Sequence, residues 1–152
     1  MLFRSKKWLA IVGILLVIAL GAGLYAYKEY MRKPKTALEV ETVFTLSPHD
    51  ISKSFMDDEQ KANKTYSGKA IAITGAISDM KTDENGNRTI IFSDSSLNMT
   101  IIASMDSTNN VKAAGLKSGD NICVKGFCVG FNKDELLGSD LQFNRCGITD
   151  KQ

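Results

Sequence analysis

The sequence has few of the residues on which enzyme and metal chemistry depend. Its 152 residues include one histidine, one tryptophan and three cysteines. The lone His49 has no Ser, Cys or carboxylate motif beside it, so we interpret it as a surface residue rather than a catalytic base. Structural zinc sites use closely spaced Cys and His ligands, whereas these cysteines form no C-x-x-C pair and lie far from the histidine. The sequence therefore predicts a protein that is not an enzyme, with no metal site and no cofactor.

The acidic runs do not predict a cation site either. Asp57, Asp58 and Glu59 are consecutive, and consecutive positions on a helix point in different directions, so we interpret them as a solvated helix face. Residues 83–87 (DENGN) lack the twelve-residue pattern and closing Glu of a calcium loop. Their Asn-Gly pair is typical of a hairpin turn.

Charge is absent from one long apolar stretch, residues 8–27, which follows a basic N-terminus at residues 1–7. Twenty helical residues span roughly 30 Å, the thickness of the hydrocarbon core of a bilayer. We interpret the stretch as a transmembrane signal anchor in contact with membrane lipid, with the rest of the chain periplasmic or otherwise extracytoplasmic. Because both flanks are basic, the charge bias hardly decides the orientation. A cleaved signal peptide is the alternative, since small residues at 19–23 resemble a cleavage site.

The two parts of the chain differ in charge. Residues 1–35 contain seven Lys/Arg and one Glu, a net of +6, whereas residues 36–152 contain twelve Lys/Arg and sixteen Asp/Glu, a net of −4. Nucleic-acid binding depends on neutralising phosphates with cations. The acidic balance of the second part therefore makes nucleic acid an unfavoured partner and favours a protein or a small ligand.

After a linker at residues 28–46, one domain is expected over residues 47–149. Ser47, Pro48 and Asp50 form a helix start, with a hydroxyl at the N-cap, proline at the first position and an acid near the positive end of the dipole. The 3.6-residue periodicity predicts a helix that ends around Lys64.

Beyond this helix the apolar period falls to two residues. Alternation predicts strands over residues 69–77, 89–92, 97–103, 121–131 and 140–149, with a short helix over 111–116. Gly75 interrupts the first strand and is expected to mark a bulge or sharp bend. Three strands, a short helix and two strands are the element order of an OB-fold, so we predict a mainly β fold with a five-stranded OB-fold barrel. An SH3-like barrel is the nearest alternative, but it lacks a proper helix at that point.

Three blocks of the sequence resemble the tRNA_anti-like family of OB-fold proteins. They are residues 55–75 (FMDDEQKANKTYSGKAIAITG), residues 116–130 (LKSGDNICVKGFCVG) and residues 141–146 (LQFNRC). The resemblance covers about residues 47–148 and implies a small bacterial domain, often exported and anchored by a lipid or a single helix. It carries no catalytic residues over to this chain. Members often have a cysteine in the third strand, where this chain has none.

The cysteines lie in the last two predicted strands, at positions 123, 128 and 146. Outside the cytoplasm one disulfide is expected, with one thiol left over. The family blocks favour Cys128 with Cys146. A hairpin turn near Glu135 instead places Cys123 almost opposite Cys146, and three buried free thiols are a further alternative.

OB-folds bind ligands on the face around their second and third strands. The corresponding candidate platform, or its neighbours of opposite parity, comprises Arg88, Ile90, Phe92, Asn98, Thr100 and Ile102, with Lys125 and Phe127 nearby. This set has few of the cations and aromatic rings that an oligonucleotide platform requires. We therefore expect a non-catalytic, membrane-anchored binding or scaffolding module for a protein or small molecule, with a nucleic-acid-binding OB domain as the alternative.

Overall fold

The structure is a computed structural model that describes residues 6–31, 36–107, 109, 112–134, 136 and 138–149. The chain divides into two units, Met1–Pro34 and Lys35–Gln152. The first contains the helix α1 (Lys6–Tyr30), as the apolar stretch predicted. Its segment Ile11–Tyr30 has a mean hydropathy of 1.9, and none of the window that sets this value is buried. By length and composition α1 can therefore cross a membrane.

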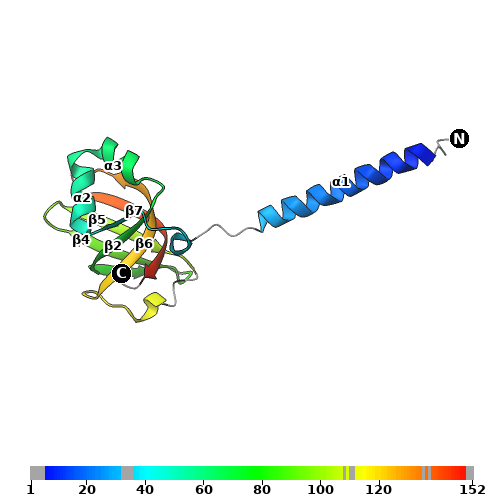
Figure 1. The fold of residues 1–152 in the computed structure, drawn as a ribbon. Helices are drawn as coiled ribbons and strands as arrows, with labels where there is room; N and C mark the ends of the chain where they lie inside the picture. Colours follow the sequence, from blue (N-terminus) through cyan, green and yellow to red (C-terminus); the bar gives the residue numbers. More distant parts are fainter. Residues whose placement is uncertain are drawn as a thin grey trace. The chain divides into compact units, whose positions relative to one another are not determined.

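The second unit is built on one sheet of seven strands in the order β1-β2-β6-β7-β5-β4-β3 (Figure 1). The strands are β1 (Phe44–Leu46), β2 (Ala70–Ala76), β3 (Asp79–Thr82), β4 (Arg88–Asp94), β5 (Met99–Met105), β6 (Asn121–Asn132) and β7 (Ser139–Thr149). The last four confirm the strands predicted at 89–92, 97–103, 121–131 and 140–149, with ends shifted by a few residues. The 3₁₀ helix η2 (Lys112–Gly115) lies between β5 and β6, where a short helix was expected. Val111, the predicted first residue of that helix, lies outside the described residues.

The predicted number of five strands is wrong, for two reasons. The first predicted strand, over residues 69–77, corresponds to β2, which pairs with β6, and an unpredicted strand, β3, follows it and pairs with β4. Only Ile77 and Ser78 separate them, so this short bend joins distant parts of the sheet and curls it into a barrel. If β2 and β3 are counted as one bent strand, the five OB strands are all present. The remaining strand, β1, is an addition that runs parallel to β2.

The bend does not lie at Gly75, where a bulge was predicted. Gly75 pairs with Ile122 in an unbroken register between β2 and β6. A Cβ at Gly75 would lie 2.7 Å from Cγ of Pro48. The glycine is therefore needed for the close approach of the preceding helix, not for a change in strand direction.

Two helices, α2 (Pro48–Asp57) and α3 (Glu59–Tyr66), stand where one was predicted. The predicted start of α2 at Ser47 is confirmed. The structure adds a capping box, because the Ser47 side chain accepts from the Asp50 backbone and the Asp50 side chain accepts from the Ser47 backbone. The break comes at Asp58, which has φ −154° and whose carboxylate accepts a hydrogen bond from the Lys61 backbone at 2.9 Å. Asp58 is therefore the N-cap of α3 and not simply part of a solvated face.

Residues 36–46, expected to belong to the linker, pack onto the barrel, and we call them the strap. The strap contains the 3₁₀ helix η1 (Ala37–Glu39) and β1. Ala37 is fully buried, and a Cβ at Gly147 of β7 would lie 2.5 Å from Cδ1 of Leu38. The strap therefore covers part of the outer side of β6 and β7.

The turn between β3 and β4 confirms the predicted hairpin. The Asp83 amide donates to the Asn87 carbonyl at 2.9 Å, and Gly86 takes the positive φ of +79° that the turn requires. The Asp83 carboxylate accepts hydrogen bonds from the Asn87 side chain and backbone, and these bonds lower the pKa of Asp83. Its oxygens are thus occupied within the turn.

The core fills the barrel and extends beneath α2. Its largest fully buried side chains include Phe55, Phe92, Ile71, Ile90, Ile101 and Leu141. Because α2 and strands from both sides of the barrel contribute to one cluster, the helix and the sheet bury their apolar faces against each other.

Candidate functional site

The structure divides the predicted platform between the interior and two outer walls of the barrel. Ile90 and Phe92 are each 0% exposed and belong to the core, so they cannot contact a ligand at the surface. Their cross-strand partners, Ala103 and Ile101, are buried with them. Alternate residues of a strand face opposite sides, so on β4 the outward residues are the neighbours of opposite parity, which the prediction had left open.

The outward side of β4 and β5 carries hydroxyl and aliphatic side chains. Thr100 lies here opposite Ser93, and Ile102 lies opposite Ile91. Arg88 is half-buried at the start of β4, and Asn98 is an exposed turn residue with φ +48° just before β5. Among the described residues this wall presents no exposed aromatic ring on either strand.

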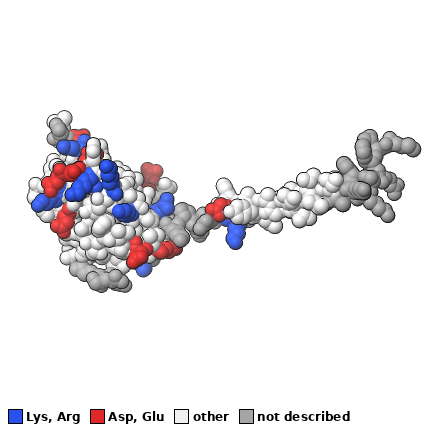
Figure 2. Space-filling model, turned by 45° about the horizontal axis from the view of Figure 1, so that its top comes forward, with Lys and Arg blue, Asp and Glu red and all other residues white. Residues whose placement is uncertain are grey.

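The charges on the second unit are mixed. Figure 2 shows Lys and Arg side chains interspersed with Asp and Glu over the face in view. The neighbouring strand β3 repeats this pattern on a small scale, with the exposed Asp79 and Lys81 two residues apart. The described residues of β3 therefore do not form a cationic track of the kind that follows a phosphate backbone.

Lys125 and Phe127 lie on the other wall, on β6, in different environments. Lys125 is only 7% exposed, and its ammonium group donates to the Val40 carbonyl of the strap. It is therefore a structural residue and not part of a ligand platform. Phe127 is half-buried and lies beyond this contact.

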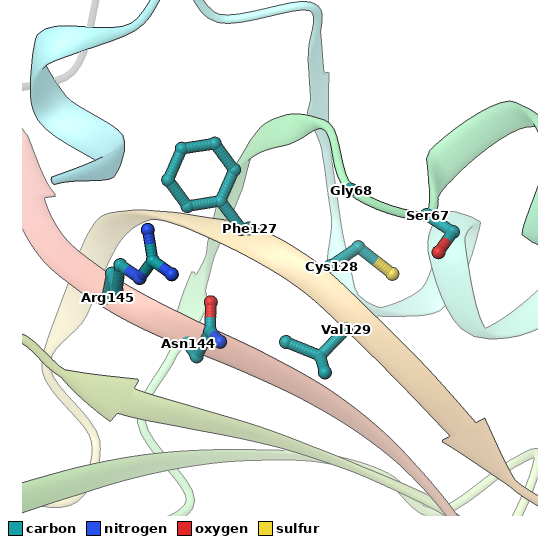
Figure 3. A pocket seen from close by; sticks show the side chains of 7 residues that line it. All are labelled: Ser67, Gly68, Phe127, Cys128, Val129, Asn144 and Arg145. Atoms are coloured by element: carbon teal, nitrogen blue, oxygen red, sulfur yellow. The ribbon is translucent and has the colours of Figure 1, made fainter. Parts of the chain in front are cut away.

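Phe127 lines a pocket of about 390 Å³ together with Ser67, Gly68, Cys128, Val129, Asn144 and Arg145. The Arg145 guanidinium lies 5.9 Å from the centre of the Phe127 ring, within the range of a cation–π contact. Figure 3 shows both side chains projecting from the same side of β6 and β7, with Asn144 between Arg145 and Val129. We call this the Phe127–Arg145 pocket. Of its residues, only Phe127 belongs to the ligand platform predicted from the sequence.

A second cluster joins His49 to the end of β4. His49 is exposed, as expected, but it is not alone, because its Nδ1 lies 2.7 Å from Oδ2 of Asp94. The Ser96 hydroxyl donates to Oδ1 of Asp94 at 2.5 Å. The Ser96 bond, and then the His49 bond, lower the pKa of Asp94. The pair ties the start of α2 to the turn between β4 and β5, beside a pocket of about 450 Å³.

The His49 cluster lacks the geometry of a catalytic triad. The Ser96 hydroxyl approaches the same ring atom as Asp94, at 3.5 Å, so it is not placed on the opposite nitrogen as a nucleophile would be. Across the described part of the chain, no three His, Cys, Asp or Glu side chains gather in a way that could hold a metal ion.

All three cysteines are buried, free thiols, so the structure does not contain the predicted disulfide between Cys128 and Cys146. Cys128 pairs with Phe143, whereas Cys146 lies opposite Gly126, so the two are not cross-strand partners. Cys123 pairs with Thr149 and not with Cys146. Burial raises the pKa of Cys128 to about 11 and also raises the pKa of Cys146. Neither thiol is activated as a nucleophile.

Comparison with known proteins agrees with this fold. The model of the tRNA_anti-like family matches residues 1–141, and the chain belongs to this family. A candidate nucleic acid-binding lipoprotein from Klebsiella pneumoniae has a similar structure, with a TM-score of 0.54 and 17% identity over 78% of this chain and 100% of that one. Asparaginyl-tRNA synthetase from Pyrococcus horikoshii gives a TM-score of 0.42 and 12% identity, over 70% of this chain and 23% of the synthetase. No curated protein matches the chain.

Proposed function

We propose that this member of the tRNA_anti-like family is a membrane-anchored OB-fold binding module that acts outside the cytoplasm and performs no chemistry. Its ligand is a protein or a small molecule. The observation that carries the proposal is the pairing of an apolar, unburied helix, α1, with a barrel whose outer surface offers pockets but no catalytic grouping among the described residues.

The anchor is supported by the energetics of α1. Apolar side chains from Ile11 to Leu24 are mostly more than half exposed, which is costly in water and favourable in lipid. The basic residues on both sides of the apolar stretch suit the head-group regions. A tether of this kind confines the barrel to a membrane surface, where it meets membrane-bound partners at high local concentration.

Membrane fractionation and protease digestion test the anchor and its orientation. We expect the full chain to resist carbonate extraction, and we expect its barrel to be digested in intact spheroplasts. The double variant Leu15→Arg/Ile18→Arg places two charges in the apolar segment, at a cost of about 3 kcal/mol each near the bilayer centre, and should appear in the soluble fraction. The matched control Leu15→Ala/Ile18→Ala should stay in the membrane. A barrel protected from protease in spheroplasts would contradict the extracytoplasmic orientation.

Nucleic-acid binding is the second candidate, because the Klebsiella pneumoniae lipoprotein with a similar structure is described in those terms. The net charge of −4 over residues 36–152 and the hydroxyl-rich wall of β4 and β5 favour a different ligand. Titration of the full chain with single-stranded oligonucleotides at several salt concentrations separates the two functions. Affinity that falls steeply with salt would replace the first proposal with the second.

A further inference from the structure

The Phe127–Arg145 pocket is shaped by an irregularity in the barrel wall. Phe127 pairs with Asn144 and Lys125 pairs with Gly147, so two residues of β7 oppose the single residue Gly126 of β6. This is a β-bulge, and Arg145 within it has φ +48°. A non-glycine residue in the left-handed region is uncommon and costs conformational energy, and such strain gathers at functional sites.

The bulge has a direct consequence for the surface. In a regular strand Asn144 and Arg145 would face opposite sides, and one of them would point into the core. Here Arg145 is exposed, Asn144 is half-buried in the pocket wall, and Cys146 takes the inward position. The strained backbone therefore places two consecutive polar side chains in the same pocket.

The polar side chains of the pocket have hydrogen-bonding groups that a ligand can use. Within the described part of the chain, the side chains of Asn144 and Arg145 make no hydrogen bond or ion pair, and the Arg145 guanidinium lies over the Phe127 ring. A guanidinium offers a planar fork of donors that matches a carboxylate in two parallel hydrogen bonds. Next to it lies the Phe127 ring, and Val129, which is 50% exposed, lies beyond Asn144 in the same pocket (Figure 3). Cationic and apolar surfaces thus adjoin within one cavity.

We propose that this pocket binds a carboxylate carried on a flat apolar body. Arg145 and the Asn144 amide hold the carboxylate, and the apolar body lies against Phe127 and Val129. The inference rests on the proposed binding function and names the ligand chemistry. Such a group occurs on free aromatic acids and at the C-terminus of a peptide that ends in an aromatic residue. The cavity of about 390 Å³ lies within the usual range for small-molecule sites.

Titrations followed by NMR on the full chain in detergent micelles test the proposal. The probes are phenylacetate for a free acid, N-acetylphenylalanine for a peptide C-terminus, and phenylacetamide as the uncharged control. We expect saturable shifts of the backbone amides of Phe127, Asn144 and Arg145 with one or both acids and none with the amide. Arg145→Gly should weaken the acids about tenfold or more, because it removes a charge-assisted contact, and glycine accepts the positive φ of the bulge. Lys112→Gln, which changes a distant exposed cation, should leave the affinities unchanged.

Three outcomes overturn the proposal: no saturable shifts with either acid, equal binding of phenylacetamide, or equal binding by Arg145→Gly. Failure here is distinct from failure of the proposed function. A chain that stays in the membrane and binds neither acid loses only the pocket assignment. A chain that binds an acid but is released by carbonate loses only the membrane anchor.

Discussion

The wall formed by β4 and β5 is regular, and the wall formed by β6 and β7 is not. β4 and β5 pair through six consecutive positions without a shift, from Thr89 with Ser104 to Asp94 with Met99. β6 and β7 shift register twice along their length. The regular wall turns hydroxyl and aliphatic side chains outward, whereas the irregular wall has the strap, a buried lysine and the Phe127–Arg145 pocket.

This difference indicates where binding capacity arises in this barrel. Side chains of a regular strand point alternately to the two faces of the sheet, so only every second side chain lies on the outer face. A β-bulge interrupts this alternation and changes the direction in which the neighbouring side chains point. The irregular wall can therefore gather an arginine, an amide and an aromatic ring in one place. The wall on which OB-folds usually bind ligands has no comparable grouping among its described residues.

The largest expected effect comes from a substitution at Gly126, the residue of β6 that lies opposite the bulge in β7. A Cβ at Gly126 would lie 2.4 Å from Sγ of Cys146 and 3.3 Å from Cβ of Phe143. We expect Gly126→Ala to lower the free energy of unfolding by about 3 kcal/mol through overpacking, measured by chemical denaturation of the full chain. Gly130→Ala in the same strand is the matched control, because no atom lies within 4 Å of its added Cβ. Equal stability of the two variants would show that the close approach of β6 and β7 is not required.

A smaller effect should follow from releasing the strap. The substitution Lys125→Met removes the buried ammonium group. The Val40 carbonyl then loses the hydrogen bond that this group donates. We expect a loss of about 1.5 kcal/mol in the free energy of unfolding and faster proteolysis within residues 36–46. Lys81→Met on the exposed side of β3 serves as the control and should change neither measurement. Unchanged proteolysis of the strap in Lys125→Met would contradict the role assigned to this contact.

Local patterns predicted much of the fold. The helix start at Ser47, the hairpin turn at residues 83–87 and the strands β4 to β7 were predicted because each depends on residues near one another in the sequence. The break at Asp58 was missed, although an Asp that can cap the backbone three residues later is a recognisable start of a helix. The sequence predicted a linker in place of the strap because β1 depends on a parallel partner 27 residues further along the chain.

The candidate site was less predictable, for physical reasons. Ile90, Ile91 and Phe92 are consecutive and apolar, so alternation alone cannot decide which of them face the core. The bulge at Arg145 depends on how two strands fit together, and only Gly126 marks it in the sequence. His49 and Asp94 are 45 residues apart, and no local pattern links them.

The smallest expected effect lies at the end of the regular wall, in the pair of Asp94 and His49. Because hydrogen bonds from Ser96 and His49 hold the pKa of Asp94 below its ordinary value of 3.8, the ionised carboxylate favours the folded state. This contribution is fully present above about pH 5 and is lost as the pH falls through the folded pKa. The Tm of the full chain should therefore fall between pH 6 and pH 3 by about 2 °C more than that of Asp94→Asn, since exposed pairs stabilise little. The pKa values of Asp50 and Asp83 are also lowered, but they affect the unsubstituted chain and Asp94→Asn equally. Their contributions therefore cancel in the difference between the two Tm changes. Parallel Tm curves for the two proteins would show that the pair does not couple α2 to the β4–β5 turn.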